Sequence, residues 1–180
     1  MAELNPMRDY FVNLARYHLW ATRKLLDEHL ADLPEADYRR DCGLFFKSIH
    51  GTLNHLLVVE SLIWLPRFAR GESPQGVALN AEVEPDRARL RQRLLDTAHA
   101  WIDYVQQLPA ARFDAPFRYT NSKGVLMSLP FAPTLAHVFN HGTHHRGQIS
   151  AALTAMRRHA PELDIVYMLQ AEVSAQGARA

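Results

Sequence analysis

Four of the ten histidines of this chain lie within the stretch HVFNHGTHHRGQI, residues 137–149. Successive residues of an α-helix are rotated by about 100°, so side chains four positions apart lie on one face with Cβ atoms about 5–6 Å apart. His137, His141 and His145 form such a column, and His144 lies about 60° to one side of His141. Two imidazole nitrogens on one helix face can bind the same divalent metal ion.

The apolar residues of the same helix indicate which of these histidines face the interior of the protein. On a helical wheel, the apolar face is defined by Val138, Ile149, Leu153 and Met156. His145 lies nearest the centre of that face, His141 next and His137 furthest. A buried metal site would therefore use His141 and His145, with His137 near the rim of the site and His144 on another side of the helix.

A third ligand must come from another helix, because structural and catalytic metal sites usually have three or four protein ligands. The second helical segment offers His50, His55 and Glu60. Five residues of helix rotate a side chain by about 140°, so only one of these three is expected to point at the ion. His55 lies mid-helix in the apolar segment GTLNHLLVVE, where an unpartnered imidazole would be costly to bury. We therefore select His55, since a third imidazole also suits an ion that two imidazoles already bind.

The same pattern fits interpretations without a metal. The stretch at residues 137–149, taken alone, is equally typical of a polar or pH-sensitive helix face, and His55, taken alone, is typical of a hydrogen-bonded core histidine. Periodicity leaves these alternatives open. Surface or rim positions are predicted for the remaining histidines His18, His29, His99 and His159.

Long helices separated by short loops are expected to position these histidines. The three- and four-residue spacing of apolar side chains predicts four long helices, at about residues 7–30, 44–70, 85–108 and 133–158. The segment ARFDAPFRYTNSKGVLMSLPFAP alternates apolar and polar residues, which predicts a short hairpin or loop before the fourth helix. A short C-terminal helix is predicted to begin at Pro161 and to pack back onto the body. Together these elements predict an all-α, mostly antiparallel four-helix bundle, with residues 1–180 as a single domain.

Composition excludes several functional classes. The chain has 180 residues, of which 48% are hydrophobic, and its twenty basic and nineteen acidic residues leave a formal charge of +1. This balance predicts no nucleic-acid binding. No apolar run approaches the roughly 20 residues of a membrane span and the N-terminal sequence lacks a signal-peptide pattern, so we expect no membrane association. The single cysteine, Cys42, can form no internal disulfide, which favours a reducing, cytoplasmic location.

The chain resembles the DinB-like superfamily of bacterial four-helix-bundle proteins, and it is also similar to the bacillithiol transferases and the mycothiol-dependent maleylpyruvate isomerase. The resemblance rests on YHLWATRKLL in the first helix, GTLNHLLVVESLIW in the second, and HVFNHGTHHRGQI followed by a late PELDIVYMLQ. These segments occur in order over nearly the whole chain. The most specific feature is the H-x-x-x-H-R-G-Q pattern, His141 to Gln148, combined with a mid-helix histidine far upstream.

This resemblance implies a three-histidine site for a divalent metal, commonly zinc or nickel, formed here by His55, His141 and His145. It also implies a homodimer. Where members of the family have a known reaction, the metal activates a low-molecular-weight thiol for transfer or isomerisation. The ligand set that the resemblance implies agrees with the set selected above from the apolar face.

Three neutral imidazoles leave a coordination position open for water or a thiol. We therefore expect a metal-dependent enzyme of the thiol S-transferase or hydrolase type, acting on a small electrophilic substrate. Arg146, Gln148 and Asn54 are candidates for residues that support the ligands, whereas Cys42 lacks a neighbouring base that would make it a nucleophile. The alternative is a metal-stabilised or metal-free bundle that serves as a stress-response or binding module, because the sequence shows no clear general acid or base beyond the ligands.

Overall fold

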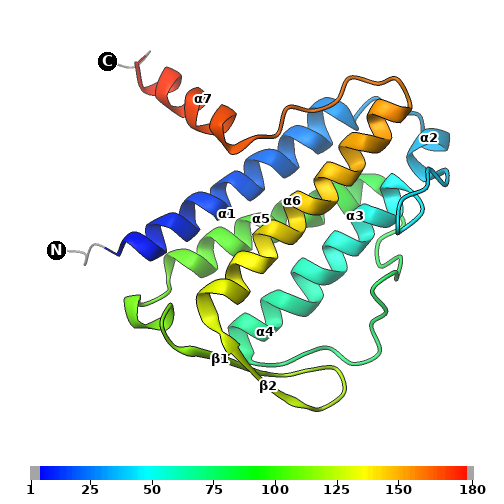
Figure 1. Ribbon diagram of the computed structural model, residues 1–180. Helices are drawn as coiled ribbons and strands as arrows, with labels where there is room; N and C mark the ends of the chain where they lie inside the picture. The colour runs from blue at the N-terminus through cyan, green and yellow to red at the C-terminus, as the bar shows by residue number, and fades with distance from the viewer. Residues whose placement is uncertain (1–4, 178–180) are drawn as a thin grey trace.

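Residues 5–177 are described by a computed structural model, in which four long helical segments form the body of the protein (Figure 1). In chain order these segments are α1 (Pro6–Lys24) with a π-helical turn (Leu25–His29), α3 (Ile49–Leu57) with a π-helical stretch (Val58–Trp64) and α4 (Leu65–Arg70), α5 (Arg87–Gln106), and α6 (Phe131–Ala155). The shorter elements are α2 (Glu35–Arg39), a 3-10 turn (Ala110–Arg112), β1 (Pro116–Thr120), β2 (Leu126–Pro130) and α7 (Ile165–Gly177).

Side-chain caps define where several of these helices begin. The side chain of Asn5 accepts hydrogen bonds from two backbone N–H groups in the first turn of α1, and Asp86 accepts one from Arg89 at the start of α5. The second segment begins at Ile49 rather than at the predicted residue 44, because Ser48 is extended and caps the backbone N–H of Gly51. The preceding residues form a loop that passes close to the metal-site candidates.

The four segments do not simply alternate in direction. Figure 1 shows α1 and α6 running one way along the bundle and α3, α4 and α5 running the other way. The contacts of α1 with α5 and of α3 with α6 are therefore antiparallel. Because α4 and α5 run in the same direction, the chain between them, residues 71–86, travels back along the bundle as a crossover.

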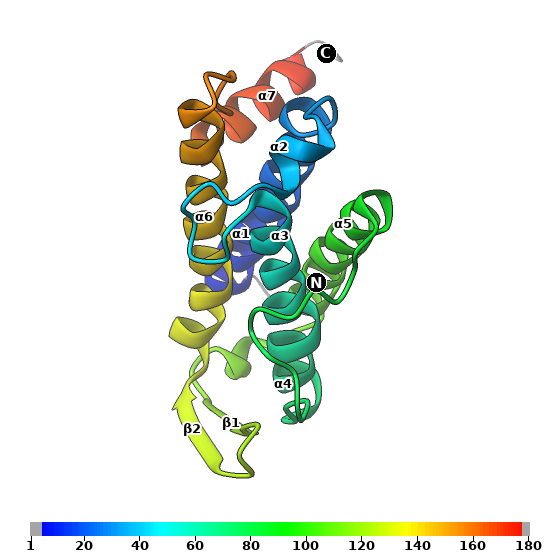
Figure 2. The ribbon, with the colours of Figure 1, turned by 90° about the vertical axis from the view of Figure 1, so that its right-hand side faces the viewer.

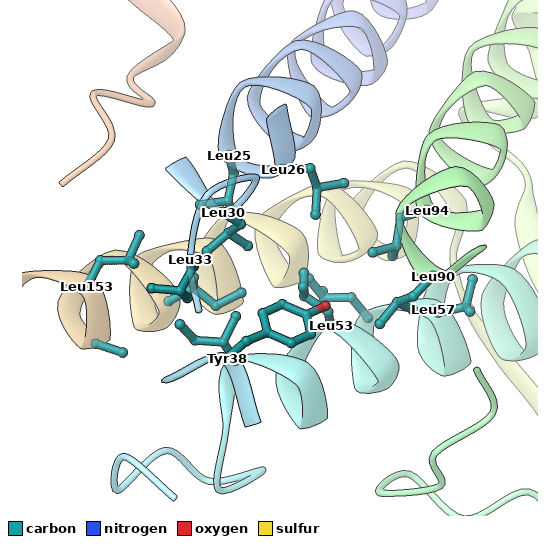
Figure 3. Close-up of a cluster of buried hydrophobic side chains, with 14 of the residues drawn as sticks. Leu25, Leu26, Leu30, Leu33, Tyr38, Leu53, Leu57, Leu90, Leu94 and Leu153 are labelled. Atoms are coloured by element: carbon teal, nitrogen blue, oxygen red, sulfur yellow. The ribbon is translucent and has the colours of Figure 1, made fainter. Parts of the chain in front are cut away.

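Two hydrophobic clusters hold the bundle together, one toward each end. The cluster in Figure 3 joins the end of the first segment to α2, α3, α5 and α6, and its largest aromatic member is Tyr38. The other cluster lies against the hairpin and includes Phe117, Trp101 and Phe139. On α6, Phe139 belongs to the second cluster and Ile149 to the first. The histidine stretch of α6 thus lies between the two cores.

The predicted hairpin and C-terminal helix are both present, but α7 begins at Ile165 rather than at the predicted Pro161. Strands β1 and β2 pair antiparallel, with Phe117 opposite Leu129, and form the lower end of the molecule in Figure 2. Helix α7 contacts α1 mainly through buried Met168, while other large apolar side chains on it remain exposed, so it packs onto the body along one side only. Within residues 5–177, no helix is long and apolar enough to cross a membrane. The prediction of an all-α four-helix bundle is confirmed.

Candidate metal centre

The structure brings His55 of α3 together with His141 and His145 of α6. The Nε2 atom of His141 lies 3.2 Å from Nε2 of His55 and 3.1 Å from Nε2 of His145. One nitrogen from each of the three rings lies within 4.8 Å of the other two. His55 and His145 are 4% and 5% exposed, respectively, so the group is withdrawn from solvent on the bundle side.

Hydrogen bonds on the far side of two rings determine which nitrogen carries the proton. The Nδ1–H of His55 donates to the backbone carbonyl of Leu79, in the crossover, at 2.8 Å. The Nδ1–H of His145 donates to Oε1 of Gln148 at 2.8 Å. Since a neutral imidazole carries one proton, the Nε2 atoms of both rings are left with lone pairs directed at His141.

The protonation equilibria also favour neutral rings. Burial, together with the neighbouring imidazoles of His145 and His55, lowers the pKa of His141 to about 3. Burial likewise lowers the pKa of His55 and of His145, although their hydrogen bonds to Leu79 and Gln148 oppose the shift. All three rings are therefore neutral near pH 7, which is the form that binds metal.

This donor set fits a divalent cation. The Nε2 lone pairs of His55 and His145 both face Nε2 of His141, at 3.2 and 3.1 Å, and a proton on that atom can satisfy only one of them. A cation bound to all three nitrogens would use every lone pair. In a tetrahedral zinc site with bonds of about 2.0–2.1 Å, ligand nitrogens are about 3.3 Å apart, close to the separations found here. Three imidazoles suit zinc, nickel, copper or iron alike.

Phe46 covers one side of the three histidines. Its ring stacks on His55, with centroids 3.7 Å apart and an interplanar angle of 17°, and lies 5.7 Å from the ring of His145. Phe46 belongs to the loop before α3, whose carbonyl at this residue would lie 2.2 Å from a Cβ atom on Gly51. Only glycine at position 51 permits this close approach, so Gly51 helps to place the ring of Phe46 over the site.

The other sequence candidates lie around the three histidines rather than among them. His137 lies toward the rim, its ring centroid 5.6 Å from that of His141, and His144 is exposed and accepts a hydrogen bond from Nε2 of Gln148 at 3.1 Å. Asn54 bonds instead to His50 and to the backbone of Glu84, so it supports the crossover and has no hydrogen bond to the site.

Arg146, the third supporting candidate, belongs to a buried polar network next to the site. Its Nη1 donates to Nδ1 of His18 at 3.0 Å, and His18 Nε2 lies 3.1 Å from Oε2 of Glu60. Because arginine only donates, His18 must accept at Nδ1 and donate from Nε2 to the carboxylate. Burial alone would raise the pKa of Glu60, but His18 and Arg146 outweigh it and the pKa is lowered. The network therefore links a buried carboxylate to a buried guanidinium through the ring of His18.

The position of His18 corrects a sequence prediction. We expected a surface or rim residue, yet His18 is 1% exposed. It follows Phe11 and Leu14 and precedes Ala21 and Leu25 at three- and four-residue steps, which places it in the middle of the apolar stripe of α1. That spacing was the available signal for its burial. Its partner Glu60 was considered only as a ligand.

Gly142 allows this network to lie against α6. A Cβ atom at this position would be 2.8 Å from Cε1 of His18 and 3.0 Å from Oε1 of Glu60. The ring of His18 is held by hydrogen bonds on both nitrogens and has little freedom to move away. Gly142 thus sets the approach of α6 to the neighbouring helices, one residue after the candidate ligand His141.

A cavity of about 440 Å³ opens beside the three histidines. His55 and His141 form part of its wall, together with His137, residues of the π-helical stretch and α4, the crossover, and Ser122 of the hairpin turn. A second hollow of about 490 Å³ lies nearby and shares Pro74 and Val77, but no histidine lines it. The cavity beside the histidines is therefore the place where a small molecule could meet a metal ion.

Fold and site together define a class: a four-helix bundle whose second and fourth long segments contribute three histidines to one buried site. Comparison with known families agrees with this class, since the DinB family model matches residues 7–177. The chain belongs to the DinB family. Protein DinB of Bacillus subtilis (strain 168) is 28% identical over 152 residues, which cover 82% of this chain and 86% of that protein.

A solved structure shares the fold. It is described as "YfiT from Bacillus subtilis is a probable metal-dependent hydrolase with an unusual four-helix bundle topology". The match has a TM-score of 0.61 and 13% sequence identity and covers 88% of this chain and 93% of that chain. At this identity the likeness establishes a common fold.

Proposed function

We propose that this protein is a divalent-metal-dependent enzyme that activates water or a low-molecular-weight thiol for attack on a small electrophilic substrate. The observation that carries the proposal is the convergence of Nε2 atoms from His55, His141 and His145 beside a cavity. When bound there, a zinc or nickel ion would supply an open coordination position that lowers the pKa of water or a thiol. His55, His141 and His145 are the residues that would hold it.

The protein's own side chains would shape the reaction in three ways. The hydrogen bonds to Leu79 and Gln148 keep two imidazoles oriented with their lone pairs inward. Phe46 excludes water from one side of the site. His137 lines the cavity beyond the three ligands, and because partial burial lowers its pKa, its neutral ring is available to accept a proton from the attacking group.

Two reaction types fit this arrangement. Attack by water would make the protein a hydrolase, and YfiT is described as "a probable metal-dependent hydrolase". Attack by a thiol would make it a thiol S-transferase, as the sequence resemblance implies. The alternative is a metal-stabilised module without catalysis, which the lack of any carboxylate among the residues lining the cavity favours.

Metal analysis and a matched set of variants test the proposal. The purified protein is expected to bind one zinc or nickel ion per chain, and His55→Ala, His141→Ala and His145→Ala are each expected to reduce binding strongly. His99→Ala, which alters an exposed histidine bonded to Arg23, is the control and should bind normally. Activity would be assayed with activated esters and with glutathione plus a reactive electrophile. Normal metal binding in all three triad variants would refute the site.

We further propose that the protein forms a homodimer through α7. This helix exposes the apolar side chains Ile165, Val166, Leu169 and Val173. A contiguous apolar strip of this kind is typical of an interface. Light scattering should show a dimer that a Leu169→Glu, Val173→Glu variant dissociates, whereas Val125→Glu, an exposed position in the hairpin turn, should leave the dimer intact.

A further inference from the structure

The cavity beside the three histidines contains one charged side chain. Among the residues that line it, Arg67 is the only lysine, arginine, aspartate or glutamate. Most of the other lining side chains are apolar, including Val59 and Ile63. One cationic side chain in a mostly apolar cavity favours a ligand that carries a negative group.

Arg67 is held in position by its neighbours. Its Nε donates a hydrogen bond to the hydroxyl of Ser73 at 2.7 Å. Its guanidinium carbon lies 4.7 Å from the ring centroid of Trp64 and 4.7 Å from that of Tyr119. These contacts fix the plane of the guanidinium group, so little conformational entropy remains to be lost when its two terminal nitrogens bind a ligand.

The charge of Arg67 lacks a counter-ion within the described part of the chain. Arg70, one turn further along α4, pairs with Glu72 at 3.7 Å. By contrast, no carboxylate of residues 5–177 forms an ion pair with Arg67. Partial burial disfavours the charged form and lowers the pKa of Arg67, so an anion in the cavity would relieve an existing cost.

We propose that Arg67 binds the carboxylate of a small organic acid in this cavity, with the apolar part of the acid lying along Val59 and Ile63. A guanidinium fork matches the two oxygens of one carboxylate, and the lining has no second lysine or arginine side chain to help bind a phosphate. The inference rests on the proposed function because it names the substrate class of the same site. The carboxylate can belong either to the electrophilic substrate or to the thiol.

Calorimetric titration of the full chain tests the inference. Metal is first removed with a chelator, so that the carboxylate cannot bind directly to a metal ion. Benzoate and its neutral analogue benzamide are the probes for a small apolar acid, and glutathione is the probe for a carboxylate carried by a thiol. Benzoate is expected to bind at least about tenfold more tightly than benzamide, because a hydrogen-bonded ion pair is lost with the amide. Arg67→Gln should abolish this preference.

Two further variants keep the test decisive. Arg67→Lys retains the charge but not the fork, so it should weaken benzoate binding several-fold even if Arg67→Gln fails to fold. Arg70→Gln removes the same charge from the same helix and should change nothing. Arg67-dependent binding of benzoate assigns the carboxylate to the substrate, and Arg67-dependent binding of glutathione alone assigns it to the thiol.

Clear results would overturn the inference. Affinities for benzoate and for glutathione that are both unchanged in Arg67→Gln, or no binding of either acid, would each contradict it. Repeating the titrations on protein exposed to zinc separates this failure from failure of the proposed function. A protein that retains no zinc but still binds the acid through Arg67 would refute the metal-dependent activity and leave the carboxylate site standing.

Discussion

The Nδ1–H of His145 donates a 2.8 Å hydrogen bond to Oε1 of Gln148, one turn further along α6. The same amide group donates from its nitrogen to His144 at 3.1 Å, so both ends of the Gln148 side chain are engaged. This contact within α6 fixes the orientation of the candidate ligand His145. It assigns a structural role to the glutamine of the H-R-G-Q pattern.

Removal of this contact is expected to weaken metal binding. Gln148→Ala should reduce zinc affinity by about 10- to 100-fold, the usual effect of losing a hydrogen bond behind a metal-bound histidine. Competition with a zinc-binding dye would measure the change. Gln148→Glu keeps an acceptor for Nδ1–H and serves as the control. Equal affinities for Gln148→Ala and the unmodified protein would contradict the role assigned to Gln148.

Alanine substitutions at Gly142 and Gly147, both on α6, are expected to change the stability of the protein in opposite directions. Gly142→Ala is expected to lower the free energy of unfolding by about 1–3 kcal/mol, because the new methyl group overlaps His18 and Glu60. Gly147→Ala meets no atom within 4 Å and should raise it by about 0.5–1 kcal/mol through helix propensity. Urea denaturation of the metal-free protein measures the unfolding free energy of both variants. Stabilisation by Gly142→Ala would show that α6 can move away from α1.

Neutralising Glu60 is expected to destabilise the fold. Glu60→Gln removes the buried carboxylate that is linked through His18 to the buried guanidinium of Arg146, for a loss of about 3–5 kcal/mol in the free energy of unfolding. Glu82→Gln removes a carboxylate of 51% side-chain exposure that contacts another histidine, His50, and should cost less than about 1 kcal/mol. Chemical denaturation compares the two. Similar losses for Glu60→Gln and Glu82→Gln would mean that burial of the network of Glu60, His18 and Arg146 does not add to its contribution to stability.

Acid should destabilise the metal-free protein through His141. Its pKa is about 3 in the folded chain but about 6.5 in an unfolded one, so below pH 6.5 the unfolded chain takes up a proton that the folded chain does not. Stability contributed by the neutral ring is complete above about pH 6.5 and falls as the pH decreases toward 3.

The His141→Leu variant isolates this effect from protonation of carboxylates. As the pH falls, the unfolding free energy of the unmodified protein should decrease relative to that of His141→Leu. The upper limit of this relative change is about 1.4 kcal/mol per pH unit, and the expected change is smaller because the ring is partly exposed. Parallel curves for the two proteins between pH 6.5 and 4 would contradict the lowered pKa.

The sequence contained most of the information needed to find the three histidines. His141 and His145 follow from helical spacing within one element, and His55 from its isolation in an apolar segment, so each depends on local geometry. The hairpin and the four long helices were likewise predicted from periodicity. The start of α3 was wrong by five residues because the cap at Ser48, not hydrophobicity, determines it.

The supporting residues were harder to predict, since they depend on how helices pack. The contact of His18 with Glu60 joins residues 42 positions apart on two different helices. It depends on how these helices pack against each other, which the periodicity of either helix alone does not specify. Arg67 was missed for a similar reason. Its proposed role follows from the neighbouring rings of Trp64 and Tyr119 and from the absence of a counter-ion among residues 5–177, which are properties of the assembled chain.

The acceptor that orients His55 is a backbone carbonyl, at Leu79 in the crossover. Every residue type supplies that oxygen, and the Leu79 side chain itself is 54% exposed. Evolutionary drift at this position therefore leaves the orientation of His55 unchanged, whereas an insertion or deletion in residues 71–86 would shift the carbonyl out of reach. Selection on the site should therefore conserve the length of the crossover rather than its amino-acid sequence.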